Sequence, residues 1–150
     1  MKALAPLVMA LALALPVKGG TATEPVEEPL FVEAGELSLD DFKWDKRPVV
    51  VFADNPADPM YRRQMEALEA RPDELRERDV VVITDTDPGA NSAVRQALRP
   101  RGFMLVLVAK DGQVLLRKPQ PWDVRELSRS IDKLPTRQQE VRDRRAAPIR

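Results

Sequence analysis

Two uninterrupted runs of apolar, mostly β-branched residues constrain the fold of this chain more than any other feature. They are residues 49–53 (VVVFA) and 80–83 (VVVI). A strand with one face in water alternates apolar and polar residues, so an unbroken run indicates a strand that is buried on both faces. Between the runs, Tyr61, Met65 and Leu68 have the spacing of one face of a helix. This strand–helix–strand order predicts an α/β domain in which the two strands are parallel.

The elements that follow complete a predicted four-stranded mixed sheet with helices on both faces. A short helix over residues 94–98 leads to a third strand over 103–109, and a turn at 110–112 leads to a fourth strand over 113–117. We expect the third strand to run parallel to the first two, because it completes a second strand–helix–strand unit. The fourth strand must then be antiparallel, because so short a turn forms a hairpin. A last helix is expected after Asp123, which can cap it.

The first 22 residues have the features of a cleaved signal peptide. Lys2 supplies a positive start, residues 3–15 are apolar except for Pro6, and 20–22 are small enough for the cleavage site. As a helix, the apolar run would span only about 20 Å of a roughly 30 Å bilayer core. We therefore expect export to a periplasm or the extracellular space, with no stable membrane anchor after cleavage.

The rest of the sequence divides into three predicted parts. Residues 23–36 are rich in proline and glutamate and lack periodicity, which indicates a flexible acidic leader. Residues 37–135 hold the predicted strands and helices and form the folded domain. Residues 136–150 are a polar, basic tail. Its arginines are mixed with acids and lack interleaved aromatic residues, so we expect no nucleic-acid binding.

The sequence contains no cysteine and no histidine. This excludes thiol redox chemistry by the chain itself, cysteine nucleophiles, Ser-His-Asp triads and the usual zinc sites. A glycine-rich phosphate-binding loop is also missing from the sequence. We assign no catalytic residue and expect no cofactor, which leaves a non-catalytic binding or structural module with an unknown protein partner as the first hypothesis.

Four aspartates support a hypothesis of another class. Asp54 and Asp58 follow the first predicted strand, and Asp85 and Asp87 follow the second. Ligands of open α/β sheets gather beyond the carboxyl ends of parallel strands, and oxygen ligands suit Ca²⁺ or Mg²⁺. These residues, with Tyr61 nearby, are candidate ligand-binding residues of a divalent-metal-binding protein or hydrolase. Aspartate is equally common in turns and helix caps, so a purely structural role stays open.

Trp44 and Arg47 precede the first strand and form a candidate partner surface. Tryptophan and arginine are the side chains that most often carry the binding energy of protein interfaces. Packing against the end of the sheet is the alternative for both.

Several short segments carry a family resemblance. They are residues 41–48 (DFKWDKRP), 58–61 (DPMY) with Gln64, 77–79 (ERD), 108–112 (VAKDG), and 131–137 (IDKLPTR) with Glu140. In these segments the sequence resembles the bacterial family called domain of unknown function 4174. It departs from that family's pattern at Ala109, where the family has glycine, and at Leu134 and Thr136, where it has methionine.

The resemblance implies a thioredoxin-like fold, related to domains of secreted matrix proteins that have no established reaction. Thioredoxins carry their reactive cysteines in the turn after the first core strand, where this chain reads DNPAD at residues 54–58. The resemblance therefore implies the fold without the redox activity. It also suggests a further alternative, an accessory protein that docks on thiol redox enzymes.

Overall fold

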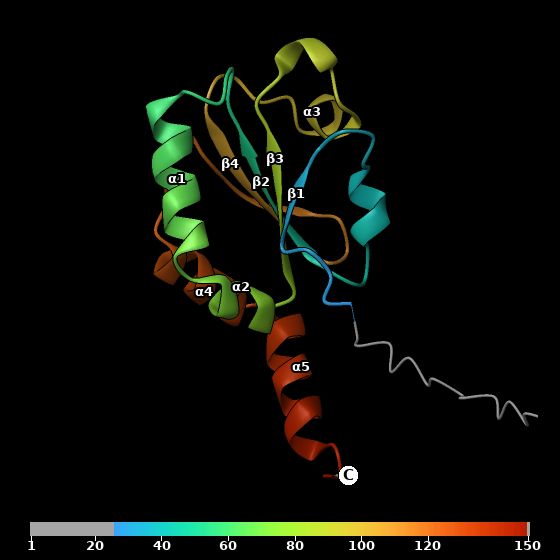
Figure 1. Ribbon diagram of the computed structural model, residues 1–150. Helices are drawn as coiled ribbons and strands as arrows, with labels where there is room; N and C mark the ends of the chain where they lie inside the picture. Colours follow the sequence, from blue (N-terminus) through green and yellow to red (C-terminus); the bar gives the residue numbers. More distant parts are fainter. Residues whose placement is uncertain (1–25, 150) are drawn as a thin grey trace, which may run out of the picture.

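The computed structural model describes residues 26–149, so the predicted signal peptide lies outside the described part. The domain is built on a five-stranded mixed sheet in the order β1-β3-β2-β4-β5 (Figure 1). The strands are β1 (Phe31–Glu33), β2 (Arg47–Phe52), β3 (Val80–Asp85), β4 (Met104–Val108) and β5 (Val114–Lys118). Between residues 26 and 149, no helix is long and apolar enough to cross a membrane.

The two apolar runs form the centre of the sheet. β2 and β3 pair in parallel along their whole length, from Arg47 opposite Val80 to Phe52 opposite Asp85. This confirms the predicted parallel pair. Alternate residues of a strand point to opposite faces of the sheet. An unbroken apolar run therefore places apolar side chains in the core on both faces. Val49 belongs to the hydrophobic cluster on one face and Phe52 to the cluster on the other.

Helices cover both faces of the sheet, as predicted. They are α1 (Pro59–Glu69), α2 (Pro72–Glu77), α3 (Ala93–Leu98), α4 (Val124–Asp132) and α5 (Pro135–Ala146), with two 3-10 turns, η1 (Leu39–Phe42) and η2 (Pro88–Ala90). Leu68 of α1, Leu75 of α2 and Leu127 of α4 pack in one cluster. Leu98 of α3 packs in the other cluster, with Phe42 of η1 at its margin.

The predicted direction of the third core strand was wrong. β4 pairs with β2 in antiparallel fashion, with Val50 opposite Val106. A parallel strand would require the connection to return along the whole length of β3. The six residues of α3 rise about 9 Å, whereas the six residues of β3 span about 20 Å. α3 therefore stays near the carboxyl end of β3 (Figure 1), and β4 enters the sheet from that end.

The fifth strand was not predicted. β1 lies parallel to β3, with Phe31 opposite Val82, inside the 23–36 segment that we expected to be flexible. Leu30 and Ala34 are 5% and 3% exposed, so both ends of this strand are anchored in the core. A three-residue strand is too short for a visible alternation, and its hydrogen bonds are made with a segment about 50 residues away.

The C-terminal tail is helical in its described part. α5 extends away from the end of the sheet at which β2 and β3 begin (Figure 1). Arg137 is its one buried residue among those described. The N-cap of α5 is Leu134, which makes no side-chain capping bond. α5 therefore adds no buried apolar side chain to the core, and other contacts must hold it.

Candidate functional site

The four candidate aspartates differ in their hydrogen bonds and in their exposure to solvent. Asp58 caps α1, where its Oδ1 accepts hydrogen bonds from the N–H groups of Met60 (2.8 Å) and Tyr61 (3.4 Å). Asp87 caps η2 by accepting from the N–H of Gly89 at 3.1 Å. Asp54 is exposed in the turn after β2. Capping thus accounts for two of the four carboxylates.

Asp85 is buried and holds α3 against the sheet. Its carboxylate accepts hydrogen bonds from the hydroxyl of Ser92 and from Nη2 of Arg95, the latter at 3.0 Å. Arg95 also donates to the backbone oxygen of Ala53 and lies over the ring of Phe52. Burial raises the pKa of Asp85, but the hydrogen bonds from Arg95 and Ser92 outweigh it, so the pKa lies below its ordinary value. Sequence reasoning missed Ser92 and Arg95, because neither belongs to a recognisable motif.

A pocket of about 380 Å³ opens at the carboxyl end of β3. It brings together Tyr61, Asp85 and Asp87 but not Asp54 or Asp58, and β1 adds Glu33 to its wall. Burial raises the pKa of Tyr61, although a hydrogen bond with Thr84 acts in the opposite direction. The pocket thus collects three of the five candidate ligand-binding residues.

Divalent cations are expected to leave the melting temperature unchanged. Within residues 26–149, no three carboxylates are placed to hold a metal ion. Millimolar Ca²⁺ or Mg²⁺, compared with EDTA in a thermal melt followed by fluorescence, should therefore give the same Tm. A rise in Tm that disappears in Asp87→Asn would instead support the metal hypothesis.

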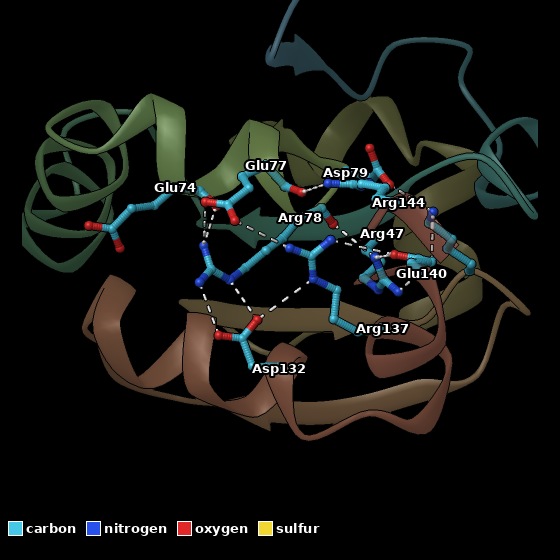
Figure 2. A network of polar contacts seen from close by, with 10 residues as sticks. Arg47, Glu74, Glu77, Arg78, Asp79, Asp132, Arg137, Glu140 and Arg144 are labelled. Carbon is cyan, nitrogen blue, oxygen red and sulfur yellow. Dashed lines mark hydrogen bonds and ion pairs between the residues drawn. The ribbon is translucent and has the colours of Figure 1, made fainter. Parts of the chain in front are cut away.

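The opposite end of the sheet holds a network of ion pairs around α5 (Figure 2). Arg47, the first residue of β2, is fully buried. Its Nη1 and Nη2 donate to the two carboxylate oxygens of Glu140 on α5 at 3.2 and 2.9 Å, and Nη1 also donates to the backbone oxygen of Arg78. Arg47 was a candidate for a partner surface, with packing against the end of the sheet as the alternative, and the structure places it buried at that end. Glu140 of α5 lies against its guanidinium, and the side chain of Arg47 is 0% exposed.

Glu140 is the centre of this network. It also accepts a contact at 2.9 Å from Nζ of Lys110, which reaches Asp79 at the same distance. Burial raises the pKa of Glu140, but hydrogen bonds from Arg47 and Lys110 together place it below the ordinary value. Arg137 is 3% exposed at its side chain and lies 3.7 Å from Glu140. The carboxylate thus faces three cations.

A second pair extends the network to α4. Nε and Nη2 of Arg78 donate to the two oxygens of Asp132 at 2.9 and 3.0 Å (Figure 2). The hydrogen bonds that Arg78 donates to Asp132 raise the pKa of Arg78. Arg137 lies between this pair and Glu140, 3.7 Å from Asp132. Glu74 and Arg144 lie outside the segments that carry the family resemblance, whereas the other residues of this network fall within them: Arg47, Glu77, Arg78, Asp79, Lys110, Asp132, Arg137 and Glu140. That shared membership marks these residues in the sequence, whereas their pairing with one another depends on the packed fold.

Trp44 is exposed and held in an unusual backbone conformation. It lies between η1 and β2, and it is 74% exposed to solvent. Its φ is +65°. A residue with a Cβ is uncommon at positive φ and stays there only when its surroundings hold it. Its N–H donates to the backbone oxygen of Lys110 at 2.7 Å. Of the two residues of the candidate partner surface, Trp44 is therefore exposed and Arg47 is buried.

Several solved structures are similar in fold to this chain. A reduced 2-Cys peroxiredoxin of Plasmodium vivax is 14% identical, with a TM-score of 0.53, covering 69% of this chain and 85% of that one. Thioredoxin peroxidase I of Plasmodium yoelii is 17% identical, with a TM-score of 0.49 over 69% of this chain and 80% of that one. StoA of Bacillus subtilis is 10% identical, with a TM-score of 0.38 over 57% and 82%. At 14% identity the likeness to the Plasmodium vivax peroxiredoxin concerns the fold alone, and it confirms the predicted thioredoxin-like α/β architecture.

Sequence comparison assigns the family. Among curated proteins, none matches this sequence. The family described as "Domain of unknown function (DUF4174)" matches residues 38–140, which is more than half of the chain. The match begins just before η1 and ends at Glu140, so it spans both Trp44 and the ion-pair network. This chain belongs to the DUF4174 family.

Proposed function

We propose that this protein is an exported, non-catalytic binding module that docks on a protein partner through Trp44. The exposure of Trp44 on a fixed backbone is the observation that carries the proposal. A tryptophan that becomes buried between two bound proteins is among the strongest contributors to their binding energy. A side chain whose backbone is already ordered loses less entropy on binding, so this geometry favours a contact role.

The turn after β2 supports a non-catalytic role. In thioredoxin-like proteins this turn carries the reactive thiols, whereas here it reads Asp54 to Asp58 without cysteine. The side chain of Asn55 accepts a hydrogen bond from the N–H of Ala57 at 2.9 Å, and Asp58 caps α1. These polar side chains stabilise the turn itself. The activity of the structural neighbours is therefore not part of the proposal.

Replacing Trp44 with alanine is expected to weaken partner binding by about 30-fold, the effect of losing a typical interface hot spot of about 2 kcal/mol. The partner would first be captured in cells by a photo-crosslinking amino acid at position 44 of the full chain. Affinity of the purified partner would then be measured by calorimetry. The Tm of Trp44→Ala should stay close to wild type, because the side chain is mostly in water.

Met60 offers a matched control. It is 42% exposed and follows the opposite end of β2, at the start of α1. A crosslinker at position 60 should not capture the partner at the yield obtained from position 44. Met60→Ala should bind the partner within about twofold of wild type. Equal affinity of Trp44→Ala and wild type would refute Trp44 as the contact. A partner with reactive cysteines would assign the module to thiol redox enzymes.

A further inference from the structure

Lys110 connects Trp44 to the C-terminal helix. Its backbone oxygen accepts the hydrogen bond from the N–H of Trp44. Its side-chain Nζ lies 2.9 Å from Glu140 of α5 and 2.9 Å from Asp79, which precedes β3. The same residue therefore holds the Trp44 backbone on one side and is held by α5 on the other.

Arg47 provides a second connection to the same carboxylate. It lies three residues after Trp44, and its guanidinium is bound by both oxygens of Glu140. The segment from Trp44 to Arg47 is thus attached at both ends, and Glu140 pairs with the side chain of a residue at each attachment, Lys110 and Arg47. Within the segment, the N–H groups of Asp45 and Lys46 donate to the backbone oxygen of Phe42, so η1 closes the loop from the other side.

α5 itself is held by charges rather than by apolar burial. Its one buried residue among those described is Arg137, and its other contacts with the domain include Arg144, 3.5 Å from Asp79. Releasing the helix would uncover little apolar surface, whereas burial of apolar surface is what usually makes a docked helix permanent. Release would, however, withdraw Glu140 from Arg47 and Lys110 at once.

We propose that α5 is a clasp that keeps Trp44 in its binding conformation. With Glu140 docked, Lys110 and Arg47 hold the loop and Trp44 stays at positive φ. With α5 released, the loop relaxes toward ordinary backbone angles, because the left-handed conformation is unfavourable for a residue with a Cβ. The inference rests on the proposed function in treating Trp44 as the contact residue, and it makes the C-terminal helix the regulator of that contact.

The backbone mobility of Trp44 tests the clasp without any partner. In the full mature chain labelled with ¹⁵N, the order parameter of the Trp44 amide should be about 0.85 in wild type and fall below about 0.6 in Glu140→Gln. Hydrogen exchange of residues 135–146 should become faster in the same variant. Glu126→Gln is the matched control and should behave as wild type, because within residues 26–149 Glu126 pairs with Arg129 alone, on the exposed face of α4.

Two results would overturn the inference. One is faster exchange in α5 with an unchanged order parameter at Trp44, which would show that helix and loop are uncoupled. The other is unchanged exchange in α5, which would show that Glu140 does not hold it. If Glu140→Gln does not fold, Lys110→Met removes one bridge and keeps the backbone oxygen, and the same two readouts apply. A partner that binds without Trp44 would refute the proposed function but leave these measurements valid.

Discussion

Replacing Glu140 with glutamine is expected to lower the free energy of unfolding by about 3 kcal/mol, the usual cost of breaking a buried ion pair from one side. The amide keeps the shape of the side chain and loses its charge. Arg47, fully buried, would then have no anion against its guanidinium, and Lys110 would lose one of its two carboxylates. The penalty comes from the cation that is left behind, not from the loss of a contact as such.

Urea unfolding followed by circular dichroism measures this change. Glu126→Gln is the control, and its loss should stay below about 0.5 kcal/mol because that pair is exposed to solvent. Arg47→Met combined with Glu140→Leu removes both charges and should cost less than Glu140→Gln alone. Equal losses in Glu140→Gln and Glu126→Gln would show that the buried network contributes nothing.

The same network predicts loss of stability in acid. The pKa values of Glu140 and Asp85 lie below their ordinary values in the folded chain. Each carboxylate therefore contributes stability that is fully present above its unfolded pKa of about 4, and that is lost as the pH falls through the lower folded value. Glu140→Gln should accordingly show a shallower decline in stability below pH 4 than wild type.

Asp85→Ala is expected to cost about 3 kcal/mol or more, because it leaves a buried cation unpaired at the other end of the sheet. The side chain of Arg95 is 10% exposed and that of Asp85 is 4% exposed. Without the carboxylate, Arg95 keeps only backbone acceptors, and Ser92 loses its acceptor. We expect α3 to open first, because these bonds attach it to β3.

Asp87→Ala is the matched control for this second prediction. It removes a nearby aspartate whose side chain only caps η2, so about 1 kcal/mol should be lost. Urea unfolding gives the free energies, and hydrogen exchange over residues 93–98 reports the opening of α3. Similar losses in the two variants, with no change in exchange, would contradict the assignment of Asp85 as the anchor of α3.

Local patterns predicted what depends on neighbouring residues. The apolar runs identified β2 and β3, since only a strand buried on both faces needs such a pattern. The spacing of Tyr61, Met65 and Leu68 identified α1, because the apolar face of a helix recurs every three or four residues. The direction of β4 depends on the end of the sheet at which α3 ends. No local sequence pattern indicates which end that is.

The candidate functional residues show the same difference between what local sequence predicts and what distant segments decide. Trp44 was singled out from its type and position, and it is exposed; Arg47 was singled out with it, and it is fully buried. The two differ because α5, from the far end of the sequence, covers one and not the other. Capping explains Asp58 and Asp87, whereas Asp85 became a buried ion pair through Arg95, which lies ten residues away.

The sequence by itself determined the absence of thiol and imidazole chemistry, the strand–helix–strand core and the family, because these depend on which residues are present and on short spacings. Only the tertiary structure decided that cations and carboxylates from five separate segments form one network, and that Trp44 stands exposed beside it. The physical reason is that burial and charge pairing join residues such as Arg47 and Glu140, 93 positions apart, and their partners are set by the packed fold rather than by adjacent sequence.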